Sequence, residues 1–498
     1  WSSAIAFSIV VGLSCSFAVA APKAAKAKAA REASSGPPLH LVGETPEQML
    51  ALAVATAKSG SDQAIAGLIA IEELSTKVSR ARLDAAIGEV VGATSGGVRD
   101  DAIGLRARLS VGEVRASGVV KNLSILGPIS DSNGGLTTRS LEDAADGGFT
   151  RSSVLHDWGV YQVRWRSVPN SLITGRGLAL DLLLHPRSET CSYLASGLDL
   201  PSDAKFRLHV ASAGSVRVSF DGKDLGTSEE IHSELGLERI GARIQAEKGR
   251  HLLVAKVCSG ALGDSGRVRL RVSGDDGSGM DLPWSSAVSE YGSGWAKSSF
   301  QSLDLPLAKA LAVGEASSVS EALVAAMVRT MGGAEDLRTP KSSALLDRVV
   351  QSAGEDAELW ATAAWATAMR GDRTGRFNKA LSLSHGEKNA GVRSFALRQL
   401  AESRLDSHLG DWAMTALETS PLRGAGDFEA KFLRARVLGD WTAMRRAALK
   451  DLEVLAEQNA DIPILWSEIA EMAGPFDREL QLRALDRLAA VWPEDDCA

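Results

Sequence analysis

The sequence has few aromatic residues and few histidines, and each scarcity excludes a class of function. Aromatic residues make up only 5% of the 498 residues, which argues against a deep, ring-lined sugar tunnel and favours closely packed helices. The eight histidines are scattered, and no two stand at the i, i+4 spacing that puts two metal ligands on one helix face. We therefore predict no metal site.

Motifs for covalent catalysis and for nucleotide binding are also missing from the sequence. The chain has no Gly-x-Ser-x-Gly nucleophile turn, and its glycine-containing turns lack the lysine and the helix start that phosphate binding requires. The net charge of −7 gives no broad attraction to nucleic acid. The sequence therefore predicts no catalytic residue, no cofactor and no nucleic-acid partner.

An apolar run fills residues 1–20 and ends in small residues. It predicts a secretory signal peptide cleaved after Ala20, and without an initiating Met we expect the native chain to begin before Trp1. A membrane anchor is the alternative, but the run is on the short side of the ~20 apolar residues that a span needs. Lipid attachment at Cys15 is a second alternative, although Gly12 stands where a lipoprotein signal usually has Leu.

Export through such a signal places the protein in the periplasm or outside the cell, with no membrane span after cleavage. Residues 21–43 are mainly Ala, Lys, Pro, Ser and Gly near their start, which predicts a flexible linker. Thr45 can then cap a helix that begins at Pro46. Residues 44–118 are predicted to form helical hairpins, with amphipathic segments at 63–74, 78–91 and 98–109.

The hydrophobic period falls to two over residues 119–273, as in half-buried antiparallel strands. The segments 206–211, 216–220 and 268–273 alternate apolar and polar residues, and Asp221-Gly222 is a strong hairpin signal. This pattern predicts a jelly-roll-like β-sandwich, and the Gly- and Ser-containing residues 274–301 predict a linker after it.

The helical period returns over residues 302–498. Gly-Asp dipeptides at 371, 410 and 439 each stand between two amphipathic segments, with spacings of 39 and 29 residues, and we predict turns there. This pattern predicts a tetratricopeptide-like α-solenoid whose concave face holds an extended partner. No polar capping helix follows the last segment, so we expect the native protein to continue beyond Ala498.

The fold class predicted from these segments is α+β and multidomain, with an antiparallel β-sandwich between an N-terminal helical region and a C-terminal solenoid. Cys191 and Cys258 lie in or beside predicted strands, where either a structural disulfide or two buried thiols would fit. Trp284, Tyr291 and Trp295 could stack on a sugar. We favour the alternative, in which these rings pack between the sandwich and the solenoid.

The order of motifs resembles the N-terminal half of large exported bacterial transglutaminase-like proteins with tetratricopeptide repeats. The resemblance rests on Gly118-Val-Val-Lys-Asn-Leu-Ser-Ile-Leu-Gly-Pro-Ile129, on Val163-Arg-Trp-Arg166 and on the Asp-Gly hairpin. It implies a sandwich similar to carbohydrate-binding jelly rolls, and a papain-like Cys-His-Asp domain near the C-terminus of the whole protein. Ile129 replaces the usual aromatic residue after Gly-Pro, and no catalytic cysteine can be carried over to this chain.

The sequence leads us to expect a non-enzymatic scaffold that binds a protein or glycan partner at the bacterial envelope. One alternative is the non-catalytic front half of an exported transglutaminase-like or cysteine-protease enzyme. Another is a carbohydrate-binding protein, which would expose aromatic side chains on one face of the sandwich. Trp165 pointing inward and Arg164 pointing outward is the ordinary expectation for a strand at that position.

Overall fold

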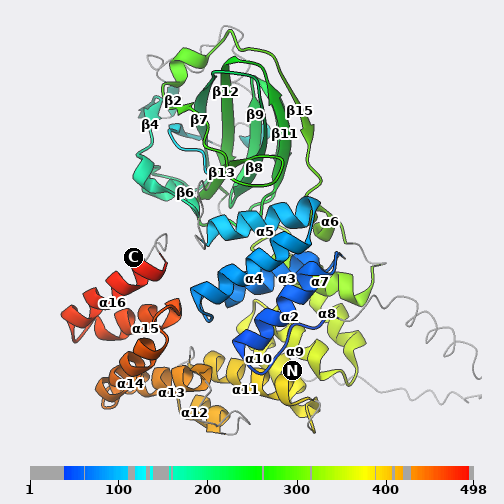
Figure 1. Cartoon of the computed structure of the whole chain (residues 1–498), viewed down its shortest axis with the longest axis vertical. Coiled ribbons are helices and arrows are strands. Elements are labelled where there is room, and N and C mark those ends of the chain that lie inside the picture. The colour runs from blue at the N-terminus through cyan, green and yellow to red at the C-terminus, as the bar shows by residue number, and fades with distance from the viewer. Residues whose placement is uncertain are drawn as a thin grey trace, which may run out of the picture.

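The computed structural model places a β-sandwich against a curved body of helices (Figure 1). It describes residues 39–60, 62–109, 118–130, 135–137, 156–158, 161–260, 263–313, 317–386, 389–405, 410–418 and 428–492. The predicted fold class is confirmed, with N-terminal helices, two antiparallel sheets and C-terminal helical hairpins in that order. The predicted signal peptide and the linker up to residue 38 lie outside the described residues.

The N-terminal helices start where local capping allows. Thr45 Oγ1 accepts a hydrogen bond from the Gln48 amide, and the side chain of Ser79 accepts one from the Arg82 amide. The linker prediction was wrong for its last residues, because Leu39, Leu41 and Val42 are buried in the helical core. The N-terminal helices are α2 (Pro46–Lys58), α3 (Ala64–Leu74), α4 (Arg80–Ala93) and α5 (Gly96–Arg108).

The C-terminal helices pack as antiparallel hairpins, in which α7–α8, α9–α10, α11–α12, α13–α14 and α15–α16 are the pairs. The first helices of these pairs begin 33 to 38 residues apart, near the tetratricopeptide period. The C-terminal helices are α6 (Pro306–Leu311), α7 (Val319–Thr330), α8 (Ser342–Ala353), α9 (Ala357–Trp365), α10 (Arg370–Leu383), α11 (Ala390–Leu405), α12 (Gly410–Glu418), α13 (Phe428–Asp440), α14 (Arg445–Gln458), α15 (Pro463–Ala473) and α16 (Arg478–Val491).

The Gly-Asp dipeptides are not the hairpin turns, so that prediction was wrong. Gly371 lies in the first turn of α10, Gly410 is the first residue of α12, and Gly439 lies near the end of α13. A Cβ at Gly439 would lie 2.2 Å from Met472 Cε, and one at Gly410 would lie 3.0 Å from Trp441 Nε1. These two glycines therefore serve close approach between hairpins.

The sandwich consists of two antiparallel sheets. One has the order β10-β9-β12-β7-β1-β4, with β14 also paired to β7, and the other has the order β15-β11-β8-β13-β6-β5. The strands are β1 (Ser124–Ser130), β4 (Arg166–Ser167), β5 (Ile173–Thr174), β6 (Gly177–Ala179), β7 (Thr190–Leu200), β8 (Ala204–Ser212), β9 (Ser215–Phe220), β10 (Lys223–Ser228), β11 (Ile240–Ala246), β12 (Gly249–Cys258), β13 (Arg267–Ser273), β14 (Trp284–Ser285) and β15 (Ser298–Ser302), and β2 (His156–Trp158) pairs with β3 (Tyr161–Val163).

Residues 274–301 are not a simple linker, which corrects the sequence prediction. They contribute β14 to one sheet, nearly all of β15 to the other, and the 3₁₀ turn η5 (Val288–Tyr291) between them. Trp284 and Tyr291 are buried and anchor this segment to the sandwich. The Gly and Ser content of the segment suggested a linker, whereas pairing with distant strands decides its structure.

The helices before and after the sandwich share one hydrophobic core. Residues of α2–α5 and of α7–α16 belong to the same buried cluster, and α3 packs on α7. Figure 1 shows the N-terminal helices lying inside the curve formed by the later hairpins. The sandwich is therefore an insertion into a single helical body.

Buried charges join the sandwich to α5. Arg207 of β8 forms an ion pair with Asp100 of α5, and within the sandwich Arg269 Nη2 lies 3.2 Å from Glu238 Oε1. The charge of Arg108 on α5 also acts on Glu238. Burial alone would raise the pKa of Glu238, but the arginines around it, Arg269 foremost, hold that pKa well below its usual range. Burial and the charge of Arg271 lower the pKa of His209 to about 3, so this imidazole is neutral and shares a hydrogen bond with the Ser273 hydroxyl.

A buried ion pair holds the β9–β10 hairpin. Asp221 and Gly222 have φ values of 51° and 71°, as expected for the two central residues of a tight hairpin turn. His251 Nδ1 lies 2.8 Å from Asp221 Oδ2, and His251 Nε2 lies 2.8 Å from the Glu247 carbonyl oxygen. Burial alone would lower the pKa of His251, but these two hydrogen bonds raise it.

The stability of this hairpin should depend on pH. Because the pKa of His251 is raised on folding, its contribution is complete below the ordinary histidine pKa of about 6.5 and is lost as the pH rises through the folded-state pKa. We expect His251→Gln to lower the free energy of unfolding more at about pH 5.5 than at about pH 9. Urea titrations at both pH values test this, and a loss that is equal or larger at the higher pH would contradict it.

Candidate protein-binding surface of the helical repeats

The first helices of the later hairpins face the N-terminal hairpins. Lys77, in the turn between α3 and α4, lies 3.4 Å from a carboxylate oxygen of Glu402 on α11 and 3.4 Å from one of Glu429 on α13. The Ile464 amide on α15 donates to the Thr76 carbonyl, 3.1 Å away. The α3–α4 turn thus spans three successive hairpins.

The charges at this contact stabilise one another. Burial alone would lower the pKa of Lys77, but Glu402 and Glu429 raise it above its ordinary range. Lys77 in turn lowers the pKa of Glu402. Arg398 Nε lies 3.0 Å from Glu429 Oε2, which extends the network along α11 and α13. Removal of Lys77 would take one positive charge from both glutamates, and Arg398 would still pair with Glu429.

The position of the α3–α4 turn changes the expectation for the solenoid. We expected the concave face to hold an extended partner, but the turn already contacts α11, α13 and α15 there. His40 Nδ1 also lies 2.9 Å from Glu358 Oε2 on α9. A partner therefore needs another surface of the described helices.

Large apolar side chains are exposed at or beside the turns inside consecutive hairpins. Trp412 lies in the first turn of α12, Trp441 and Met444 lie between α13 and α14, and Phe476 lies between α15 and α16. Their exposed fractions are 63%, 37%, 40% and 54% in that order. We call these four residues the turn ridge. Exposed aromatic groups gathered in one place are typical of interaction surfaces.

Contacts between neighbouring hairpins connect the turn ridge. Trp441 packs over Gly410 at the start of α12, and the Arg445 guanidinium lies 4.9 Å from the centre of the Phe476 ring. A cavity of about 360 Å³ adjoins the ridge. Arg436 and Glu468 are among the residues that line it. The Arg436 guanidinium lies 2.9 Å from Glu468 and crosses from α13 to α15.

The sequence analysis missed the turn ridge, although a signal was present. Tryptophan follows the Gly-Asp dipeptide twice, in Gly410-Asp-Trp412 and Gly439-Asp-Trp441. A tryptophan at the boundary of a helix lies off its apolar stripe, so the repeated position could have marked both rings as exposed.

The sandwich aromatics do not form a ligand-binding face, which corrects one reading of Trp284, Tyr291 and Trp295. Trp284 and Tyr291 are buried, and Trp295 is half-buried with its Nε1 donating to the Tyr291 carbonyl at 2.5 Å. Tyr291 lies directly over Gly197 of β7. The favoured alternative was also wrong, because Tyr291 and Trp295 pack on the outer face of the sheet containing β7 and β12, while Trp284 joins the core of the sandwich.

The prediction that Trp165 points inward and Arg164 outward is confirmed. Its side chain is buried among residues of β7 and β12, while Arg164 is exposed. The side chain of Trp158 lies outside the described residues. A glycan-binding sandwich was expected to expose its aromatic rings, and the burial of Trp165 and Trp284 weakens that hypothesis.

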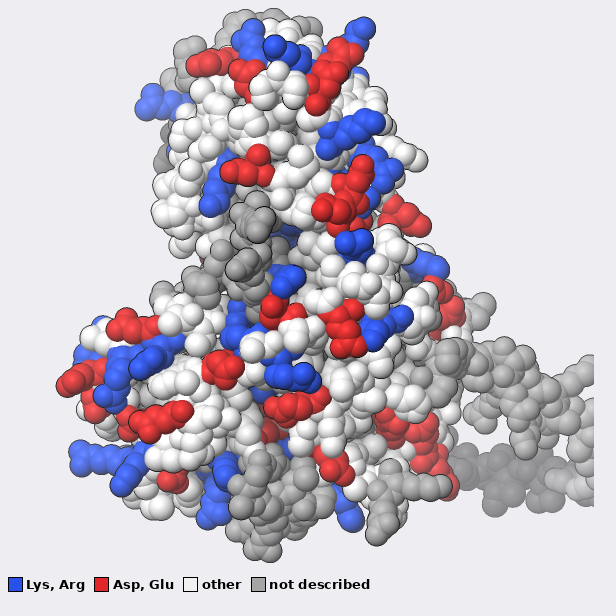
Figure 2. All heavy atoms as spheres, viewed as in Figure 1, with Lys and Arg blue, Asp and Glu red and all other residues white. Residues whose placement is uncertain are grey.

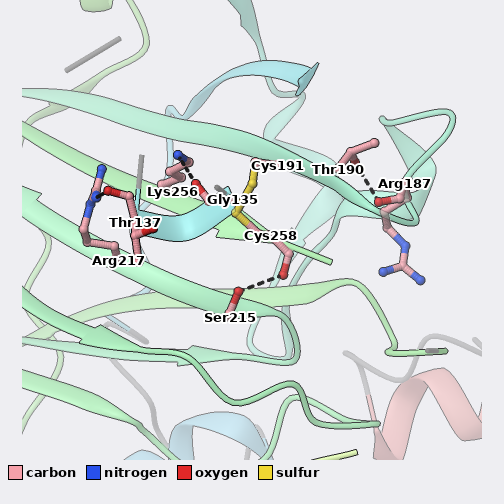
Figure 3. Close-up of a disulfide and its surroundings, with 9 residues drawn as sticks. All are labelled: Gly135, Thr137, Arg187, Thr190, Cys191, Ser215, Arg217, Lys256 and Cys258. Carbon is pink, nitrogen blue, oxygen red and sulfur yellow. Dashed lines mark hydrogen bonds between the residues drawn. A yellow bond between two sulfur atoms is a disulfide. The ribbon is translucent and has the colours of Figure 1, made fainter. Parts of the chain in front are cut away.

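Cys191 and Cys258 are joined in a disulfide (Figure 3). They are opposite residues of the adjacent strands β7 and β12, with a Cα–Cα distance of 4.0 Å. Leu136 of η1 (Gly135–Thr137) covers the bridge, and Lys256 Nζ donates to the Gly135 carbonyl at 2.6 Å. The bridge and this hydrogen bond hold η1 against the sheet.

Groups of side chains that could bind a metal are not found among the described residues. Over the same residues, no helix combines the length and the apolar character that crossing a membrane requires.

Comparison with known proteins assigns no family to the chain. No family model matches the chain, and no curated protein matches it. Among solved structures, the chain is similar to YrrB, described as a TPR protein with an unusual peptide-binding site. The identity is 17%, the match covers 32% of this chain and 79% of YrrB, and the TM-score is 0.24. The tetratricopeptide-like character of the helices therefore rests on their own hairpin packing.

The disulfide should contribute measurably to stability. It closes a sequence separation of 67 residues, so replacing both cysteines by serine should lower the free energy of unfolding by about 2–4 kcal/mol. Urea unfolding of the variant and of the wild type, each with and without a reductant, measures this. A reductant should destabilise only the wild type, and equal stability of the two proteins without reductant would contradict the expectation.

Proposed function

We propose that the protein is an exported, non-enzymatic scaffold that binds a protein partner at the bacterial envelope through the turn ridge. The observation that carries the proposal is the exposure of Trp412, Trp441, Met444 and Phe476 along consecutive hairpins. Buried tryptophan and arginine anchors contribute most of the energy of protein interfaces. The ridge offers two tryptophans, and Arg445 lies beside it against the Phe476 ring.

Two features support export. The apolar run over residues 1–20 has the pattern of a secretory signal, and the Cys191–Cys258 disulfide suits an oxidising compartment. The alternative, that the chain is the non-catalytic front half of an enzyme, has no supporting observation among the described residues. We therefore develop the scaffold proposal.

The ridge runs along successive hairpins, so an elongated segment can contact several of its side chains at once. Residues i and i+7 of a helix are about 10.5 Å apart and lie on one face. Positive and negative side chains are interspersed over the face that Figure 2 shows. We therefore propose an amphipathic helix with heptad-spaced apolar side chains as the bound segment.

Photo-crosslinking in the native envelope tests the proposal. A photoreactive residue at Trp441 or Phe476 should give a defined adduct with one protein, whereas the same residue at Leu182, an exposed apolar position on the sandwich, should not. With the captured partner in hand, Trp441→Ala should weaken binding by about thirtyfold if Trp441 is an anchor. Leu182→Ala serves as the matched control.

Phe476 is more than half exposed, so Phe476→Ala should leave thermal unfolding nearly unchanged. Trp441 packs over Gly410, so Trp441→Ala should cost some stability, and binding is compared at a temperature where both variants are folded. Binding that survives the loss of both Trp441 and Phe476, or that Leu182→Ala weakens equally, would contradict the proposal.

A further inference from the structure

The Cys191–Cys258 disulfide lies on the outer face of its sheet and not in the core of the sandwich. Along β7 and β12, Tyr193 and Val254 pack on the outer face, and strand alternation places the two cysteines on the same face. Among the described residues, Leu136 of η1 is the apolar side chain that covers the bridge. The cover of the disulfide is therefore a short turn and not the second sheet.

A cavity of about 310 Å³ reaches the disulfide from one side. Its walls include the three residues of η1 and, on the sheet, Cys258 with its neighbours Ser215 and Ser259. Figure 3 shows η1 beside Cys258 and Ser215. Among the described residues, Cys258 lines this cavity and Cys191 does not. A water molecule takes up about 30 Å³ in the liquid, so the cavity has room for a small thiol next to Cys258.

The main-chain pairing of β7 with β12 does not need the disulfide. The Ser259 amide donates to the Thr190 carbonyl at 2.9 Å, so this neighbouring pair carries ladder hydrogen bonds. Because hydrogen-bonded and non-hydrogen-bonded pairs alternate in an antiparallel ladder, Cys191 and Cys258 form a pair without them. Cleavage of the disulfide thus removes no main-chain hydrogen bond between the two strands.

The turn η1, in contrast, rests on the disulfide. Leu136 packs on the two cysteines, Lys256 Nζ donates to the Gly135 carbonyl at 2.6 Å, and Arg217 Nη1 donates to the Thr137 carbonyl at 3.5 Å (Figure 3). Two thiols cannot remain at bonding distance, so the sulfur atoms must move apart beneath Leu136 once the bond is cut. Cleavage therefore disturbs the packing of η1 before it disturbs the sheet.

We propose that Cys258 is a site of thiol–disulfide exchange with a dithiol that enters this cavity, and that the exchange frees η1 from the sheet. A thiolate of the dithiol attacks Cys258 Sγ, the bond to Cys191 Sγ breaks, and Cys191 leaves as a thiolate. The second thiolate of the dithiol then attacks its partner sulfur in the mixed disulfide, and Cys258 leaves as a thiolate. The protein gains two electrons and, after protonation, two thiols, while the dithiol becomes a disulfide.

Adduct mapping on the native full chain tests which sulfur is attacked. Free thiols are blocked with a maleimide, 2-mercaptoethanol is added briefly, and an isotopically labelled maleimide then traps the cysteine that leaves. Mass spectrometry of peptides should find the mercaptoethanol adduct on Cys258 about tenfold more often than on Cys191, because access decides which sulfur reacts. Equal adducts on both cysteines, or adducts that form only in urea, would overturn the proposal.

Two leucine variants separate access through the cavity from reduction through unfolding. Leu136→Ala opens the cover, so it should speed up reduction by dithiothreitol about tenfold or more. Leu225→Ala removes a leucine of similar burial from the sandwich core and lowers stability, but it leaves the cover in place. Reduction of the Leu225 variant as fast as that of the Leu136 variant would contradict entry through the cavity.

Chemical labelling of lysine measures the release of η1. Lys256 is buried beside η1, so its acylation by an N-hydroxysuccinimide ester should become about tenfold faster after reduction, while the exposed Lys205 keeps its rate. The amides of Leu194 and Ala255, which face each other in the ladder, should stay protected from hydrogen exchange. Unchanged labelling of Lys256, or loss of protection at Leu194 and Ala255, would show that reduction does not act on η1 alone and would overturn the proposal.

Discussion

The contact between Lys77 and the glutamates of α11 and α13 is the constraint on which the helical body depends. It ties a turn near the start of the chain to helices more than 300 residues later. Half-buried charges of this kind are costly unless they are paired, so the position of Lys77 fixes how the later hairpins curve. Because the α3–α4 turn occupies their inner face, a partner of these hairpins must bind elsewhere, and the turn ridge is an apolar surface that faces solvent.

The same constraint explains how a sandwich can interrupt a helical protein. The strands run from Ser124 to Ser302, but the helices on both sides belong to one core. The ion pair between Arg207 of β8 and Asp100 of α5 then holds the sandwich against α5. Charge pairs therefore both close the helical body and orient the inserted sandwich.

Local chemistry made much of the fold predictable. Thr45 before Pro46 marked a helix start, alternation marked β8, β9 and β13, and Asp221-Gly222 marked a hairpin. Pairing between distant segments was not predictable, and β14 and β15 were missed because Ser- and Gly-containing sequences become strands only when a partner strand is present. Gly410 and Gly439 were predicted to be turns. Their actual role is to allow close approach of a neighbouring hairpin, which the local sequence does not show. The residues of the candidate surface were not predicted, because the exposure of Trp441 and the burial of Trp284 depend on tertiary packing.

Hydrogen exchange of a Lys77→Met variant tests the central claim most directly. We expect faster exchange in α11 and α13 as well as in the α3–α4 turn, because both glutamates lose their shared partner. Lys309→Met, which breaks the exposed pair with Asp62, should change exchange only nearby. Faster exchange confined to α3 and α4 in the Lys77 variant would contradict the account, because the early and late helices would then be independent units.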